Sequence, residues 1–230
     1  MKIICSWCKK IIGEKEPFDD PSISHAKCAA CLSRQDKPLD GTTQKSLLVY
    51  TLKIVLEGSN PPIWRRIQVR GNTKLDVFHI ILQSAMGWGD KHSHEFIIGK
   101  KKYANPSQEL EKTLDEAGYT LSQLIKEKGQ SFKYTYDFGD DWLHEIMVEN
   151  IETKNIKLLY PVCLEGERAC PPEDIGGVPG YEERLLALKD PSHPEHKEIA
   201  DWFEPSFNPE EFSLNAVNKY LKFLKGLYAK

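Results

Sequence analysis

The chain has 230 residues, of which 40% are hydrophobic and 28% are charged, as in an ordinary soluble globular protein. A formal net charge of −3 excludes a chain-wide basic surface for nucleic acid, although a local basic face stays open. The sequence shows no apolar run of about 18 residues and no signal-peptide pattern at its start, so we expect a cytoplasmic protein with no membrane partner.

Four cysteines near the amino terminus predict a zinc site. Cys5 and Cys8 form one C-x-x-C pair, and Cys28 and Cys31 form a second, at a spacing typical of a zinc ribbon. Four thiolates saturate a tetrahedral zinc ion, which leaves no open position for catalysis, so we expect a structural Zn²⁺. Because few apolar residues surround the cysteines, metal binding would supply most of the folding free energy of residues 1–35.

A linker and a hairpin are expected next. Residues 36–46 are polar, contain a proline and a glycine, and show no apolar period, which is typical of a linker. The main domain would span residues 47–230 and begin with strands at 47–56 and 63–69. The Gly-Ser-Asn-Pro-Pro turn between these strands predicts a hairpin.

The apolar spacing after the hairpin predicts a helix over residues 75–86, with Thr73 as its cap and Gly87 at its end. His79 lies beside the apolar stripe of this helix, where a hydrogen-bonded core histidine is more usual than a metal ligand. The remaining expected elements are a strand at 92–99, a short helix at 121–128, strands at 132–138 and 142–151 that form a second hairpin, and two or three helices over 181–229. Strands followed by helices predict an α+β domain with a mainly antiparallel sheet, packed helices and C-terminal helices.

Several motifs, taken in order, resemble those of the plasmid pRiA4b ORF-3 family. They are PPIWRRIQV from Pro61, AMGW from Ala85, HSHEF from His92, YDFGDDWLHEI from Tyr136, and the long loop CLEGERACPPEDIGGVPGY from Cys163. The resemblance runs from about residue 47 to 224. It implies an α+β fold and an association with plasmid or mobile DNA, and it implies no established activity.

The HSHEF motif carries a candidate metal site. His92 and His94 are two residues apart, so on a strand both imidazoles project from one face and could bind one ion. Further ligands would come from the DFGDDWLH segment, which contains Asp137, Asp140, Asp141 and His144. Mixed imidazole and carboxylate ligands suit zinc, manganese or iron, and an open position could activate water for hydrolysis.

A structural interpretation explains the same residues. The DFGDD sequence suits a turn between strands, since glycine permits positive φ and aspartates accept hydrogen bonds from nearby backbone amides. His144 alternates with apolar neighbours and could sit in the core with a single hydrogen bond.

The proline- and glycine-rich loop that begins at Cys170 should follow one rigid path, because proline fixes φ and glycine permits unusual φ values. Such a loop could display Glu173 and Asp174 toward a ligand, or hold the helix that follows. Cys163 and Cys170 could be buried thiols, part of an incomplete metal site, or a redox pair. The resemblance weakens the last two, since Ile175 stands where many relatives have a third cysteine.

Two functional hypotheses follow from the sequence. The first is a zinc-binding, non-catalytic protein that binds nucleic acid or a protein partner. The second is a metal-dependent hydrolase or nuclease that uses the histidine and aspartate cluster of the main domain. We expect the first, because the sequence contains no recognisable catalytic motif.

Overall fold

The computed structural model describes residues 2–5, 11–14, 23–26, 48–153, 160–203 and 207–227. The chain divides into two compact units, Met1–Gln44 and Lys45–Lys230. The first unit contains three short strands: β1 (Lys2–Cys5), β2 (Ile11–Glu14) and β3 (Ile23–Ala26). Strand β1 lies in the middle, antiparallel to β2 and parallel to β3.

Three of the four predicted zinc ligands lie outside the residues that the structure describes. Cys5 is the last residue of β1, whereas Cys8, Cys28 and Cys31 lie outside the described residues. The zinc site therefore stays a prediction from the cysteine spacing.

The second unit is built on one eight-stranded sheet with the order β11-β5-β4-β10-β9-β6-β7-β8. Its strands are β4 (Leu48–Leu56), β5 (Ile63–Arg70), β6 (His94–Ile98), β7 (Lys101–Ala104), β8 (Thr113–Asp115), β9 (Ser131–Tyr136), β10 (Trp142–Thr153) and β11 (Val162–Glu167). Both predicted hairpins are present, as β4 with β5 and β9 with β10. Among the described strands of this sheet, only β7 and β8 pair in parallel, so the mainly antiparallel α+β prediction is confirmed.

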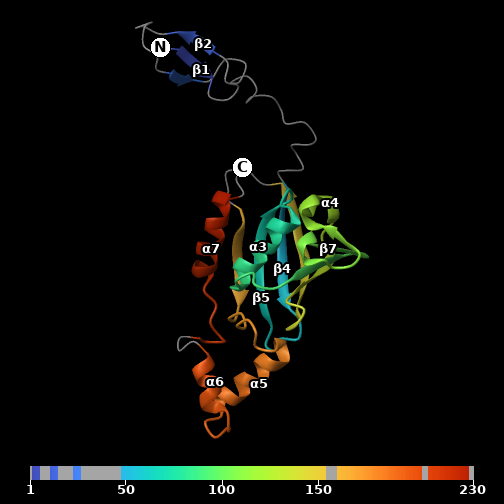
Figure 1. Cartoon of the computed structure of the whole chain (residues 1–230), viewed down its shortest axis with the longest axis vertical. Helices are drawn as coiled ribbons and strands as arrows, with labels where there is room; N and C mark the ends of the chain where they lie inside the picture. Colours follow the sequence, from blue (N-terminus) through green and yellow to red (C-terminus); the bar gives the residue numbers. More distant parts are fainter. Residues whose placement is uncertain are drawn as a thin grey trace. The chain divides into compact units, whose positions relative to one another are not determined.

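Five α-helices accompany the sheet in the described part of the chain. They are α3 (Leu75–Met86), α4 (Leu121–Leu124), α5 (Gly177–Lys189), α6 (His196–Trp202) and α7 (Leu214–Leu227). Helix α3 lies over the sheet beside α7, while α5 and α6 lie beyond one end of the sheet (Figure 1). No helix among the described residues is long and apolar enough to cross a lipid bilayer.

The core forms where α3 packs on the sheet. Phe78 of α3 stacks on Phe96 of β6, with ring centroids 5.8 Å apart. Along β10 the buried side chains alternate with exposed or half-buried ones, which places His144 between Trp142 and Ile146 on the core face. This arrangement follows from the period of two in a strand that has one face against a core.

Several predicted boundaries differ from the structure. Helix α3 ends at Gly87 as expected, in a left-handed conformation with φ of 109°, but its N-cap is Lys74 rather than Thr73 and makes no side-chain capping hydrogen bond. Helix α4 ends at Leu124 rather than near residue 128, because the next residue, Ile125, becomes extended and fully buried, and its carbonyl accepts a hydrogen bond from Tyr50.

Strands β7, β8 and β11 were not predicted. Strand β8 has only three residues, and β7 begins with two exposed lysines, so neither carries a clear apolar alternation. Strand β11 contains Gly166 within the segment that the sequence suggests is a loop, and its pairing with β5 shifts register between Cys163 and Glu165. Tertiary pairing rather than local pattern forms these three strands.

Candidate functional site

The turn between β9 and β10 is fixed by its own aspartates. Asp137 and Asp141 have positive φ values of 57° and 52°, a conformation that aspartate tolerates better than most residues. The Asp137 side chain accepts a hydrogen bond from the Gly139 N–H at 2.9 Å, and its own N–H donates to the Ser93 carbonyl at 2.8 Å. The second bond ties the turn to the segment before β6.

The proline- and glycine-rich loop lies directly against this turn. The Asp140 carboxylate accepts hydrogen bonds from the backbone N–H groups of Ile175 at 3.0 Å and Gly176 at 3.2 Å. At Gly177, where φ is 67°, an added Cβ would lie only 2.2 Å from the Asp140 carbonyl oxygen. The chain approaches itself so closely here that glycine is required.

The hydrogen bonds between Asp140 and the loop place Asp174 at the end of the sheet, beside His92 and Asp137. The His92 Nε2 lies 3.2 Å from the Asp174 Oδ1 and 3.7 Å from the Asp137 Oδ2. Nitrogen and carboxylate oxygens from all three residues lie within 4.8 Å of one another. The side chains are 29% exposed for His92, 11% for Asp137 and 65% for Asp174, so the group is open to solvent on one side.

The His92 Nε2 has an unusual environment. It is buried, and it makes no hydrogen bond within the described part of the chain, although two carboxylates lie nearby. Buried side-chain nitrogens normally have a partner. Asp174 has a left-handed φ of 61°, so two of the three residues in the group hold a rarely populated backbone conformation.

Charged and phenolic neighbours surround this group. Tyr136 donates its hydroxyl proton to Glu173 Oε1 at 2.5 Å, and the Lys91 Nζ lies 3.3 Å from Glu173 Oε2. Burial, together with the adjacent Glu173, raises the pKa of Tyr136 above its ordinary value. The Tyr136 side chain therefore stays a hydrogen-bond donor at neutral pH.

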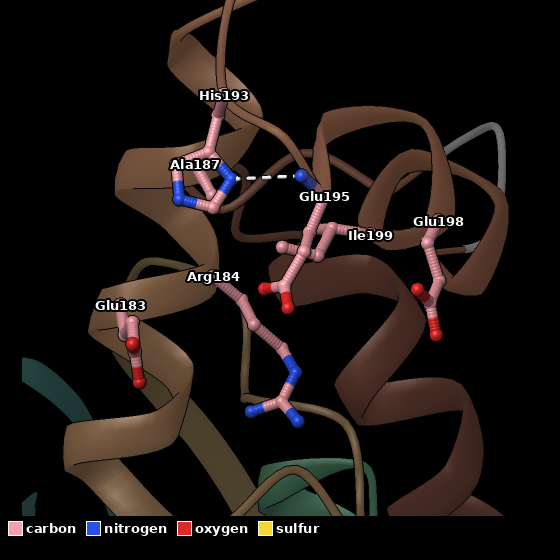
Figure 2. Close-up of a pocket in the computed structure, with 7 residues that line it drawn as sticks. All are labelled: Glu183, Arg184, Ala187, His193, Glu195, Glu198 and Ile199. Atoms are coloured by element: carbon pink, nitrogen blue, oxygen red, sulfur yellow. Dashed lines mark hydrogen bonds between the residues drawn. The ribbon is translucent and has the colours of Figure 1, made fainter.

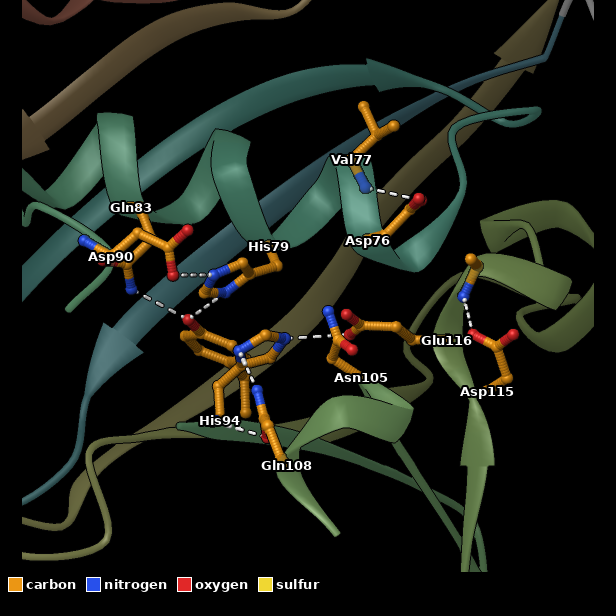
Figure 3. Close-up of polar contacts among 12 residues, drawn as sticks. Asp76, Val77, His79, Gln83, Asp90, His94, Asn105, Gln108, Asp115 and Glu116 are labelled. Carbon is orange, nitrogen blue, oxygen red and sulfur yellow. Dashed lines mark hydrogen bonds and ion pairs between the residues drawn. The ribbon is translucent and has the colours of Figure 1, made fainter. Parts of the chain in front are cut away.

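His94 belongs to a different cluster, which Figure 3 shows. Its ring stacks on that of His79 of α3, with centroids 3.4 Å apart and an interplanar angle of 3°. The His94 Nε2 lies 2.9 Å from Glu116 Oε2, and the His79 Nε2 lies 2.8 Å from Asp90 Oδ1. Both histidines are almost completely buried.

The hydrogen bonds define the proton positions on His79. The Asp90 N–H donates to Gln83 Oε1 at 3.1 Å, so the Gln83 amide nitrogen is the donor to the Tyr134 hydroxyl at 3.0 Å. The Tyr134 hydroxyl then donates to His79 Nδ1 at 2.8 Å, and the Nε2–H donates to Asp90. Burial, followed by the proximity of His94, lowers the pKa of His79 to about 4.

The same reasoning applies to His94. The His94 N–H donates to Gln108 Oε1 at 3.2 Å, which leaves the Gln108 amide nitrogen to donate to His94 Nδ1 at 3.1 Å. The remaining ring nitrogen, Nε2, donates to Glu116. Each ring in the stack therefore accepts a bond at Nδ1 and points its Nε2–H at a carboxylate.

The predicted ligand set thus separates into parts. His92 lies in a bend before β6, which begins at His94, so the two imidazoles do not share a strand face and have different partners. Of the carboxylates in the turn, Asp137 approaches His92, Asp140 binds the loop backbone and Asp141 is exposed. His144 is buried in the core, where Nδ1 lies 3.3 Å from the Tyr134 carbonyl oxygen, as the structural interpretation expected.

Three participants were not predicted as site residues. Asp90 follows shortly after the AMGW motif and Glu116 follows Asp115, but no ligand spacing marks either acid, and only the fold brings them to His79 and His94. Asp174 was identified only as a residue that a rigid loop could display. The density of prolines and glycines around it was the available signal.

A cavity of about 240 Å³ lies between α5 and α6 (Figure 2). Two of the polar side chains there, Arg184 and His193, form hydrogen bonds with backbone groups of the chain itself. Arg184 donates to the carbonyls of Ile175 at 2.6 Å and Gly180 at 3.3 Å, and the Glu195 N–H donates to His193 Nδ1 at 3.2 Å. Arg184 thereby gives the loop that carries Asp174 a second attachment.

The described domain is an α+β unit whose mainly antiparallel sheet carries a histidine–carboxylate group at the end of β9. The chain belongs to the plasmid pRiA4b ORF-3-like protein family, which it matches over residues 48–216. It is 34% identical to the uncharacterized protein y4hQ of Sinorhizobium fredii over 185 residues, which cover 79% of this chain and 95% of that protein.

A crystal structure of a protein of unknown function from Methanosarcina mazei Go1 has a similar fold. The TM-score is 0.66 at 38% sequence identity, and the match covers 73% of this chain and 96% of the other. The relatives thus establish the family and the fold, and their descriptions name no activity.

Proposed function

We propose that the family domain of this chain is a metal-dependent hydrolase that binds a divalent ion through His92, Asp137 and Asp174. The supporting observation is the buried His92 Nε2, which lies within 3.7 Å of two carboxylate oxygens and makes no hydrogen bond to any described residue. An ion between these atoms would give that nitrogen a partner and would neutralise the repulsion between the carboxylates.

The ligand types fit hydrolytic chemistry. One imidazole and two carboxylates suit manganese, iron or zinc. Three protein ligands would leave coordination positions for water, and an ion held by His92, Asp137 and Asp174 would supply Lewis-acid activation of that water for hydrolysis. The exposed side of the group, at Asp174, gives a substrate access to that position.

Lys91 and Tyr136 flank the site. Both contact Glu173, the residue before the proposed ligand Asp174, and the Tyr136 ring lies edge-on to His92 with centroids 5.9 Å apart. The Lys91 cation is suited to stabilise negative charge that would develop on a substrate oxygen, whereas the Tyr136 hydroxyl proton is already donated to Glu173. In this proposal Glu173 positions the two groups, and Asp140 positions the loop.

Binding of Mn²⁺ tests the ion site, because manganese prefers oxygen and nitrogen ligands and avoids the cysteine-rich segment. We expect the full chain to bind Mn²⁺ in electron paramagnetic resonance titrations, and Asp137→Asn combined with Asp174→Asn to weaken binding at least tenfold. Asparagine tolerates positive φ and keeps an acceptor for the Gly139 N–H, so the turn should be preserved. Asp141→Asn, in the same turn, is the matched control and should bind normally.

Hydrolysis of bis(p-nitrophenyl) phosphate and of p-nitrophenyl acetate by the manganese-loaded chain tests the reaction. Equal turnover by the double variant would contradict the assignment of the site. Tight metal binding without hydrolysis of either ester class would reduce the proposal to a metal-binding domain.

For residues 1–35 we retain the proposal that zinc is bound by Cys5, Cys8, Cys28 and Cys31, and that this module contacts nucleic acid or a partner protein. Its support is the cysteine spacing. The two metal proposals are separable by elemental analysis. Replacement of the four cysteines by serine should remove one zinc per chain and leave manganese binding unchanged.

A further inference from the structure

Helix α7 leaves two large aromatic side chains in solvent. Tyr220 is 63% exposed and Phe223 is 74% exposed, whereas most large hydrophobic side chains of the domain are buried. Because the two residues are three positions apart in a helix, their rings lie next to each other on one face. Adjacent exposed rings of this kind mark a surface suited to contact with a partner.

The opposite face of α7 fixes the orientation of the helix. Leu221 and Leu224 are buried in the core. The Asn218 side-chain amide donates to the Cys163 carbonyl at 2.8 Å and accepts a hydrogen bond from the Cys163 N–H at 2.9 Å. Cys163 belongs to β11, the edge strand of the sheet, so α7 is held along that edge (Figure 1) with its aromatic rings on the solvent side.

Two exposed lysines, Lys219 and Lys222, lie beside the aromatic rings. Lys219 is four residues before Phe223 and three before Lys222, so the two lysines form a row next to the row of Tyr220 and Phe223. Neither lysine forms an ion pair with another residue that the structure describes. The sequence of α7 contains no acidic residue, so this face of the helix is positively charged.

The acids of the neighbouring strand β11 have partners on β5 rather than on α7. Glu165 forms an ion pair with Arg66, and Glu167 accepts a hydrogen bond from the Trp64 indole nitrogen at 2.9 Å. The positive charge of α7 is therefore available to an anionic partner.

We propose that this face of α7 binds single-stranded nucleic acid, with bases stacked on Tyr220 and Phe223 and phosphates paired with Lys219 and Lys222. Every base has a flat π face that can stack on an aromatic ring, and the adjacent row of lysines suits the phosphates that run beside the bases. A partner helix, by contrast, docks through apolar anchors spread over several turns. The inference depends neither on the proposed metal site nor on the cysteine-rich module.

Fluorescence anisotropy of labelled oligothymidylate and oligouridylate, each of about 12 nucleotides, tests binding to the full chain. Binding of either supports the proposal, and the tighter of the two identifies DNA or RNA as the partner. A duplex of the same length should bind about tenfold more weakly or less, because its bases are already stacked on one another. With 5-bromouracil in the oligonucleotide, ultraviolet crosslinking and mass spectrometry should locate the contact in the peptide that contains Tyr220 and Phe223.

Two double variants separate stacking from charge. Tyr220→Ser combined with Phe223→Ser removes both rings and should weaken binding about tenfold or more. Lys219→Gln combined with Lys222→Gln should lower the salt dependence, with the slope of log K against log salt reduced by roughly 1.4, about 0.7 for each phosphate contact. All four side chains are exposed, so the circular dichroism spectrum should stay unchanged.

Leu186→Ser combined with Lys189→Gln is the matched control, since it removes an exposed apolar side chain and an exposed lysine from α5, and it should bind as the unmodified chain does. Unchanged binding by the Tyr220 and Phe223 double variant, equal affinity for the duplex, crosslinks confined to residues 1–44, or no binding of either oligonucleotide would each overturn the proposal. Binding to anionic phospholipid vesicles in place of the oligonucleotides, or self-association that the same double variant abolishes, would assign this face to a membrane or to a second copy and would also overturn it.

Discussion

Five buried side-chain nitrogen and oxygen atoms of the described residues make no hydrogen bond, and the His144 Nε2 is one of them. Its ring packs edge-on against Trp88 and near Tyr134, and its Nδ1 lies within hydrogen-bond reach of the Tyr134 carbonyl. The Nε2 has no partner within the described residues. Burial, as the largest cause, lowers the pKa of His144 to about 4.

Acid should therefore destabilise the fold through this residue. The folded-state pKa of about 4 lies below the ordinary value of 6.5, so the stabilising contribution is complete above pH 6.5 and is lost as the pH falls toward 4. At about 1.4 kcal/mol per pKa unit, the contribution is about 3 kcal/mol. Urea unfolding at several pH values should show that the free energy of unfolding falls less between pH 6.5 and pH 4 in His144→Phe than in the unmodified chain.

His79 titrates over the same range, so the acid dependence of His144→Phe should be reduced rather than abolished. A control variant at the partly exposed His193 should keep the full dependence. If the free energy of unfolding of His144→Phe fell with acid as steeply as that of the unmodified chain, His144 would not be the cause of the acid sensitivity.

The two free thiols of the main domain, Cys163 and Cys170, both have a raised pKa. Burial raises the pKa of Cys163 to about 11, and burial raises that of Cys170 further above its ordinary value. The adjacent Arg65 opposes both shifts without reversing them. Cys163 is buried and Cys170 is partly exposed. Thiols with a raised pKa are poor nucleophiles, which disfavours a redox pair.

At the scale of elements, the Asp140 carboxylate joins the turn after β9 to the loop before α5. Asp140→Ala removes the acceptor of two backbone N–H groups, and such charge-assisted bonds are worth about 1.5–3 kcal/mol each. We expect hydrogen exchange at Ile175 and Gly176 to become at least tenfold faster and Mn²⁺ binding to weaken. Asp140→Asn should show smaller effects, because it keeps one acceptor.

The neighbouring acid gives the comparison for this prediction. Asp141→Asn should leave exchange in the loop unchanged, since its side chain is exposed and has no role in holding Ile175 or Gly176. If exchange in the loop were as slow in Asp140→Ala as in the unmodified chain, Arg184 rather than Asp140 would hold the loop in place.

The elements with a clear period were predictable, and those defined by long-range contacts were not. The apolar spacing of α3 and the alternation along β10 reflect burial of one face, which a sequence records directly. The start of β6 is different. His92 was expected on the strand, but the bond from the Asp137 N–H to the Ser93 carbonyl lies outside any local pattern and accompanies a bend there.

The candidate site shows the same division. Residue types in HSHEF and YDFGDD pointed to a histidine–aspartate group, and the pairing of His92 with Asp137 agrees with that expectation. The separation of His92 from His94 could not be predicted, because it depends on long-range contacts: the bond from the Asp137 N–H to the Ser93 carbonyl, and the stacking of His79 against His94. Likewise, Asp174 reaches His92 through long-range attachment of its loop to Asp140 and Arg184.

At the scale of the whole molecule, the α+β class and the order of the main elements follow from the sequence, and the family match agrees with the resemblance of the motifs. The structure adds that His92 and His94, the two neighbours of Ser93 in the sequence, belong to two different polar clusters. One, around His92, is open to solvent and rich in carboxylates, and the other, around His79 and His94, has its imidazoles buried and fully hydrogen-bonded.

The most direct measurement of the central claim is a crystal structure of the full chain soaked in Mn²⁺, with anomalous diffraction used to locate the ion. We predict an anomalous peak about 2.0–2.4 Å from the His92 Nε2, Asp137 Oδ2 and Asp174 Oδ1, typical of manganese coordination by nitrogen and oxygen. A well-ordered His92 with no peak between these three side chains, at a manganese concentration that saturates the titration, would contradict the account.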